Sequence, residues 1–147
     1  MNWKRILCPV DLSQPSTQSI AIASSLAREN NGELIFLYVT MPELPPSAGL
    51  AIAEVDQAIE LEREALRKIR PSTAGTIHRH ELIRGLPANS IVQYAKLHNI
   101  DLIVMPTHGR QGIGRLLLGS VAEQVLRTAP CPVLTIKSVN TTGLNAP

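Results

Sequence analysis

Short apolar runs alternate with longer amphipathic stretches along the chain. The run LIFLYV at 34–39 is hydrophobic at every position, which indicates a strand covered on both faces, as in a parallel sheet between two helix layers. Four further runs predict strands, and four stretches with helical spacing of apolar residues predict helices. The predicted strands are 4–10, 34–39, 76–84, 101–105 and 132–137, and the predicted helices are 15–30, 51–70, 87–98 and 120–128.

This alternation of strands and helices predicts an α/β protein built on an open, doubly wound parallel sheet of five strands, with helices on both faces. The run TIHRHELIR at 76–84 is more polar than the others, so we expect it at or near an edge of the sheet. Asn31 and Gly32 follow the first predicted helix and should supply its left-handed stop.

Apolar residues at helical spacing support the first two predicted helices. In the first helix, Ile20, Ala23 and Ala27 lie along one face. In the second, Ala58, Leu61 and Ala65 stand at helical spacing.

Turn-forming and polar residues mark the segments between these elements. Segment 41–49 contains three prolines and a glycine, 109–118 is punctuated by glycines, and both are predicted to be loops. The polar tail at 138–147 is expected to fray. Since neither an internal repeat nor a linker is visible, residues 1–147 are expected to form one domain with its core at 4–137.

Composition excludes several classes of partner. The chain has 14 Lys+Arg against 12 Asp+Glu and only 3% aromatic residues, so it offers no basic stripe for a phosphate backbone and few rings for base stacking. We therefore expect no nucleic-acid partner. Its apolar runs fall far short of the ~20 residues that cross a bilayer, and its start lacks a signal-peptide pattern. We therefore expect a cytoplasmic protein that does not associate with a membrane.

The cysteines and histidines form no recognisable metal-binding pattern. Cys8 and Cys131 have apolar neighbours, which predicts reduced core cysteines, and a CxxC motif is absent. His78 and His80 share one face of a predicted strand without a Cys or carboxylate at ligand spacing. A histidine such as His108 can transfer protons near neutral pH, but no partner carboxylate or nucleophile is identifiable beside it.

The carboxyl ends of the strands are where a doubly wound sheet binds ligands. Three segments reach that edge, namely 9–11, the strand end at Val39, and 105–120. The last of them holds Gly109, Gly112, Gly114 and Gly119 just before a predicted helix. Glycines let backbone N–H groups approach an anion closely, and a helix N-terminus adds partial positive charge. This combination indicates a phosphate-binding loop.

Two structural roles remain open beside these functional ones. Ser120 and Glu123 fit a capping box, in which both side chains would satisfy the first N–H groups of the helix. Asp11 could accept hydrogen bonds from ribose hydroxyls or hold a metal through water, or it could instead cap the following turn with Ser13.

Two common nucleotide-binding motifs are excluded by spacing. Gly114-x4-Gly119 followed by Ser120 imitates a Walker A loop but lacks the lysine that reaches the phosphates. The first predicted strand leads into DLSQPS rather than GxGxxG, so the dinucleotide fingerprint is missing.

At these residues the sequence closely resembles the universal stress protein family. The similarity covers 4–137 and rests on ILCPVDLSQPS at 6–16, the strand end at Val39, RGLPANSIVQYA at 84–95, and THGRQGIGRLLLGSVAEQVLRTAPCPVLTI at 107–136. The last motif is the most specific. The resemblance implies a Rossmann-like fold with strand order 3-2-1-4-5, a cytoplasmic role in stress tolerance, and a homodimer formed through the fifth strands.

One branch of this family binds ATP, and another lacks the nucleotide motif. The binding branch carries G-x2-G-x9-G-[ST]. Here Gly109 and the pair Gly119-Ser120 match the latter part, whereas Pro106 takes the place of the first glycine. Proline has no N–H and a fixed φ, so any contact that needs a donor at that position is lost. The resemblance favours ATP, with or without Mg²⁺, as the ligand.

The resemblance also implies a role for each part of the site. The ends of the first two strands would border the adenine, Asp11 would bind the ribose, and the glycine loop with the start of the last helix would surround the phosphates. The predicted nucleotide-binding residues are Pro9, Val10, Asp11, Val39, Met105, Pro106, Gly109, Arg110, Gly119, Ser120 and Val121.

The leading hypothesis is therefore a stress-response protein that binds ATP and at most hydrolyses it slowly, because no residue set supports an enzymatic mechanism. The alternative is a homodimeric interaction module whose glycine loop is only structural. A phosphoacceptor receiver domain is rejected, since Arg84-Gly85 stands where its aspartate should follow the third strand. The apolar fifth strand, PVLTIK, would expose an edge in a monomer, which makes dimerisation through it physically plausible. The alternative is that the polar tail at 138–147 protects this edge.

Overall fold

A computed structural model describes residues 1–42, 52–108 and 118–137. The strands are β1 (Arg5–Pro9), β2 (Glu33–Thr40), β3 (Ile77–Arg84), β4 (Leu102–Pro106) and β5 (Val133–Ile136). The helices are α1 (Thr17–Glu29), α2 (Ile52–Arg67), α3 (Pro87–Leu97) and α4 (Ser120–Thr128). Each element lies within a few residues of its predicted range. Most of the predicted loops at 41–49 and 109–118, and the whole tail at 138–147, lie outside the described residues.

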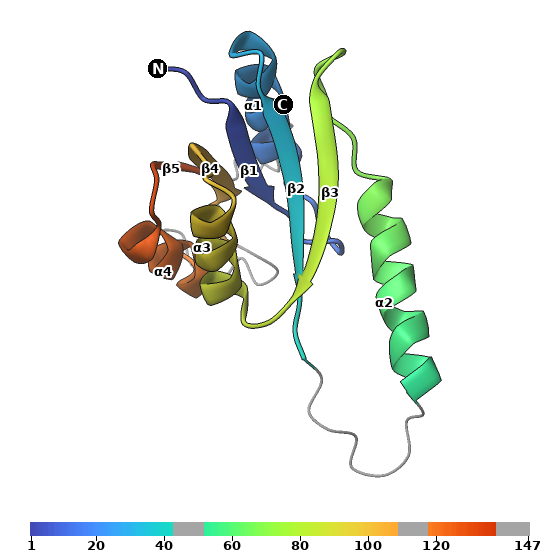
Figure 1. The fold of residues 1–147 in the computed structure, drawn as a ribbon. Coiled ribbons are helices and arrows are strands. Elements are labelled where there is room, and N and C mark those ends of the chain that lie inside the picture. Colours follow the sequence, from blue (N-terminus) through green and yellow to red (C-terminus); the bar gives the residue numbers. More distant parts are fainter. Residues whose placement is uncertain (43–51, 109–117, 138–147) are drawn as a thin grey trace, which may run out of the picture.

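All five strands are parallel and follow the order β3-β2-β1-β4-β5 (Figure 1). This confirms the predicted open, doubly wound sheet and the strand order that the family resemblance implied. It also confirms that β3, the most polar strand, is an edge. The chain reverses its direction of travel across the sheet after β3, and this reversal opens a crevice between the carboxyl ends of β1 and β4.

Two apolar layers cover the sheet, one on each face. On one face, Leu7, Ile35 and Ile103 pack against α3 and α4. On the other, Phe36 and Cys8 pack against α1 and α2. Because successive side chains of a strand point to opposite faces, the unbroken apolar runs of β1 and β2 supply both layers.

Both cysteines are unpaired, as the sequence predicts. Cys8 is fully buried, and its burial raises the pKa of the thiol to about 12. Cys131 is half-buried against the α3–α4 layer, and desolvation raises its pKa as well. Both thiols are therefore protonated near neutral pH and act as small apolar side chains.

The first helix buries Ile20, Ala23 and Ala27, which share one face, whereas the apolar residues at helical spacing in α2 do not form its buried face. Leu66 is the buried residue of α2, whereas Leu61 is 61% exposed. The face that packs against the sheet lies about one residue further along and runs through the half-buried Val55, Ile59 and Glu62 to the buried Leu66. Because this face includes a glutamate, a search for apolar residues at helical spacing does not identify it.

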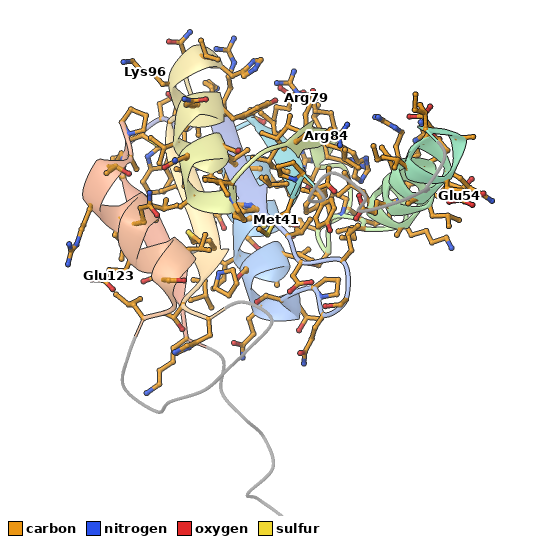
Figure 2. All side chains as sticks on the ribbon, turned by 90° about the horizontal axis from the view of Figure 1, so that it is seen from below. Met41, Glu54, Arg79, Arg84, Lys96 and Glu123 are labelled. Carbon is orange, nitrogen blue, oxygen red and sulfur yellow. The ribbon has the colours of Figure 1, made fainter. Side chains whose placement is uncertain are left out.

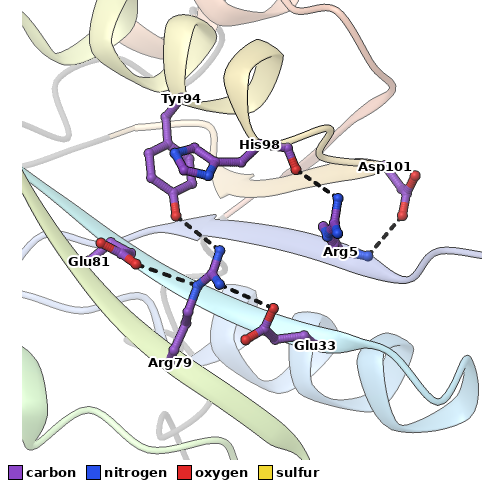
Figure 3. A network of polar contacts seen from close by, with 7 residues as sticks. All are labelled: Arg5, Glu33, Arg79, Glu81, Tyr94, His98 and Asp101. Carbon is purple, nitrogen blue, oxygen red and sulfur yellow. Dashed lines mark hydrogen bonds and ion pairs between the residues drawn. The ribbon is translucent and has the colours of Figure 1, made fainter.

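A polar network ties the sheet to α3 away from the ligand edge (Figure 3). The Arg79 guanidinium of β3 donates to the Tyr94 hydroxyl at 3.3 Å and lies 3.6 Å from a Glu33 carboxylate oxygen. At the start of β1, the backbone N–H groups of Lys4 and Arg5 both donate to Asp101 Oδ2 at 2.8 Å. These bonds join residues far apart in sequence, so they hold elements in place rather than build a site.

Candidate functional site

A cleft of about 750 Å³ opens at the carboxyl edge of the sheet. Its walls come from the ends of β1, β2 and β4, from one side of α2, and from the first turn of α4. Figure 2 looks onto this edge, with Met41 and Arg84 near its centre, Glu54 of α2 on one side and Glu123 of α4 on the other. The cleft lies where a doubly wound sheet is expected to bind its ligand.

Every predicted site residue in the described part of the chain lines this cleft. They are Pro9, Val10, Asp11, Val39, Met105, Pro106, Gly119, Ser120 and Val121. Gly109 and Arg110 lie outside the described residues. The parallel arrangement brings together segments more than 100 positions apart, because all the strand ends meet at one edge.

The carboxylate of Asp11, just after β1, is a polar group in the wall of the cleft. The Val10 N–H donates to the Leu37 carbonyl at 2.9 Å, which holds the strand end against β2. Asp11 Oδ1 then accepts from the backbone N–H of Ser13 at 3.0 Å and from its hydroxyl at 2.7 Å. The structural role left open for Asp11 is therefore real. It does not exclude ligand binding, because a carboxylate has about four acceptor sites.

The start of α4 differs from the capping box that Ser120 and Glu123 could have formed. Gly119 is the N-cap, and its carbonyl accepts from the Glu123 N–H at 2.9 Å. No side chain among the described residues caps this terminus, and the Glu123 carboxylate instead pairs with Arg127 at 2.6 Å. The capping-box alternative is therefore wrong. The first turn of α4 lines the cleft, and no side chain among the described residues accepts from its first N–H groups, an arrangement that favours an anion.

Pro106 ends β4 in the wall of the cleft. The ladder between β4 and β1 covers only Leu102 and Ile103, so β1 does not pair with β4 at the proline. The next N–H, that of Thr107, donates to the Ile136 carbonyl of β5 at 3.0 Å. The proline therefore removes a possible donor from the cleft without breaking the sheet.

Sequence reasoning missed the wall that α2 supplies. Val55, Ile59 and Glu62 line the cleft from this helix. The Tyr38 hydroxyl of β2 donates to Glu62 Oε1 at 3.2 Å, while Glu62 Oε2 is buried with no hydrogen-bond donor among the described residues. The spacing of residues 55, 59, 62 and 66 was the available signal, since it defines one helix face that includes a carboxylate.

Two further features of the described residues bear on the site. They contain no group of three or more His, Cys, Asp or Glu side chains arranged to hold a metal ion. Within the same ranges, no helix has the length and apolar character needed to cross a membrane.

Comparison with known proteins gives a consistent result. The model of the universal stress protein family matches residues 2–137. The universal stress protein MJ0531 of Methanocaldococcus jannaschii is 37% identical, over 92% of this chain and 82% of its own. Universal stress protein A homolog 1 of Coxiella burnetii is 33% identical, over 92% and 97%.

Solved structures have the same fold. The structure of protein MJ0577 is 26% identical and covers 96% of this chain and all of its own, with a TM-score of 0.77. A universal stress protein solved with cAMP and one from Archaeoglobus fulgidus solved with dAMP are each 23% identical, with TM-scores of 0.63 and 0.62. They cover 95% and 93% of this chain, respectively, and all of their own. By sequence and by fold, this chain belongs to the universal stress protein family.

Proposed function

We propose that this protein is a stress-response protein that binds an adenine nucleotide, specifically ATP, in the cleft at the carboxyl edge of its sheet. The observation that carries the proposal is the N-terminus of α4, which lines the cleft at Gly119 and Ser120 and which no side chain of the described residues caps. Uncapped N–H groups and the partial positive charge of a helix N-terminus suit a phosphate.

The order of chemical groups across the sheet supports a nucleotide rather than a free anion. From β4 to β2 the cleft presents the α4 N-terminus, then Asp11 after β1, then apolar side chains such as Val39 at the end of β2. Adjacent strands lie about 4.8 Å apart, so these groups span about 10 Å. Phosphate, ribose and base occur in the same order along a nucleotide. Two structural relatives solved with cAMP and dAMP carry ligands of this class.

The proposal predicts that ATP with Mg²⁺ stabilises the nucleotide-stripped protein in a thermal-shift titration. A ligand that binds only the folded state adds about 2.7 kcal/mol at a hundredfold excess over Kd. Gly119→Leu should abolish the shift, because it places a branched side chain beside the phosphate position. Gly119 has φ −58° and ψ 152°, which any residue adopts, so the variant should fold normally.

Lys96→Leu is the matched control, since it adds a leucine on the exposed face of α3 away from the cleft. It should keep the full response to ATP. If millimolar ATP gives no shift in the wild-type protein, the nucleotide proposal is wrong and the homodimeric interaction module becomes the better description.

A further inference from the structure

The Glu62 carboxylate, in the wall of the cleft that α2 supplies, has one buried oxygen to which no described group donates a hydrogen bond. Oε1 accepts from the Tyr38 hydroxyl at 3.2 Å, and Oε2 is buried with no donor among the described residues. Leaving a charged acceptor buried and unpaired is costly, so such a group is usually completed by a partner. The cleft is where a partner can reach it, because Glu62 lines the cleft.

The carboxylate can turn to meet a ligand without moving α2. The last torsion of a glutamate side chain is broad and roughly two-fold, so either oxygen can take the Tyr38 hydroxyl while the other faces the cleft. The carboxylate accepts at about four positions and Tyr38 occupies one of them. A ligand at this position must therefore supply a donor.

The surroundings of Glu62 specify the kind of donor. Val55 and Ile59 lie on the same face of α2 and line the cleft beside it, so the α2 wall around Glu62 is apolar. Arg84, at the end of β3, lines the same cleft. The anion-binding N-terminus of α4 lies at the other end, across β1 and β4. A flat apolar body that carries one donor, such as a nucleobase with an exocyclic amino group, matches this end.

We propose that Glu62 selects the base of the bound nucleotide by accepting a hydrogen bond from its exocyclic amino group. This inference rests on the proposed function and deepens it, because it names the residue that distinguishes a 6-amino purine from a 6-keto purine. A keto oxygen at the same position would set acceptor against acceptor, and the buried carboxylate would lose its second partner.

The test compares the dissociation constants of ATP and ITP, whose bases differ at position 6, amino against keto, and at N1, which carries a hydrogen only in ITP. The wild-type protein should bind ATP at least tenfold more tightly, as expected for a hydrogen bond to a charged group. Glu62→Gln should reduce this ratio at least tenfold, because the amide can donate to the keto oxygen. Glu60→Gln is the control, since Glu60 is exposed on the same helix and pairs with Arg63 and Arg67.

The outcomes separate this inference from the proposed function. Equal affinity of the wild-type protein for ATP and ITP would overturn the role of Glu62 without any variant. If the wild-type protein binds ATP but Glu62→Gln keeps its ratio within twofold, Glu62 does not read the base and the proposed function still stands. If the wild-type protein binds neither nucleotide, the proposed function fails and base reading fails with it.

Discussion

Gly32, between α1 and β2, is a residue whose small size is required by its neighbours. A Cβ at this position would lie 2.6 Å from the Trp3 carbonyl oxygen and 2.9 Å from that of Lys4. Both contacts are with backbone, so a side chain cannot rotate away to relieve them. The Gly32 N–H also donates to the Ala27 carbonyl at 2.8 Å, which holds the turn against the end of α1.

Gly32→Ala should therefore lower the free energy of unfolding by about 1–3 kcal/mol, the usual cost of overpacking. Urea denaturation measures the loss. Gln18→Ala, on the exposed face of α1, should change stability by less than about 0.5 kcal/mol. A Gly32→Ala protein as stable as the wild type would show that the Trp3–Lys4 backbone yields easily.

The residue pattern at this turn was only partly predictable. Asn31-Gly32 correctly marks the end of α1, but Asn31 is the residue with the left-handed conformation, at φ 49°. Gly32 is needed for close approach to β1 instead. A dipeptide signal identifies a turn locally, whereas the Trp3 and Lys4 carbonyls that crowd Gly32 come from a distant segment.

At the scale of elements, α2 is held to the sheet by a histidine at the end opposite the cleft. His80 Nε2 lies 2.7 Å from the Ile69 carbonyl oxygen, just after α2, so the neutral ring donates to it. The ring stacks on Phe36 with centroids 5.4 Å apart, and His78, Arg67 and Arg70 lie in its electrostatic surroundings. Burial, more than these positive neighbours, lowers the pKa of His80.

This lowered pKa predicts an acid-sensitive attachment of α2. Because the folded-state pKa lies below the unfolded value of about 6.5, the unfolded chain binds more protons. The contribution of His80 is therefore present above about pH 6.5 and is lost as the pH falls below it. The free energy of unfolding, measured in urea, should fall between about pH 7.5 and pH 5.5.

His80→Gln should flatten this pH dependence, since an amide can still donate to Ile69 but does not titrate. His98→Gln, at the exposed end of α3, is the control and should keep the wild-type slope. An unchanged slope in His80→Gln would contradict the anchoring role of this histidine.

At the scale of the whole molecule, β5 leaves an edge of the sheet that a second copy of the chain could extend. The strand has four residues, Val133–Ile136, and Leu134 is 37% exposed. Among the described residues β5 has only β4 as a neighbour, and an apolar edge of this kind favours strand pairing between chains. We therefore predict a homodimer through β5, with a mass about twice the 16.0 kDa of the chain.

Leu134→Lys should convert this dimer to a monomer, because it places a charge in the paired edge. Light scattering coupled to size exclusion at micromolar concentration measures the mass. Ile77→Lys changes a 68% exposed residue on β3, the opposite edge, and should leave the dimer intact. A wild-type protein that elutes only as a monomer would remove the prediction.

The sequence by itself determined the elements, the parallel sheet and most of the cleft. Apolar runs, helical spacing and glycines are local properties, and parallel strands bring their ends to one edge whatever their order. The tertiary structure alone decided that Gly119 rather than Ser120 caps α4, and that Glu62 of α2 meets Tyr38 of β2. These features depend on how distant segments pack. Contacts between segments set the rotation of a helix on its sheet, and they also decide which donors reach a buried carboxylate. No single stretch of sequence contains those contacts.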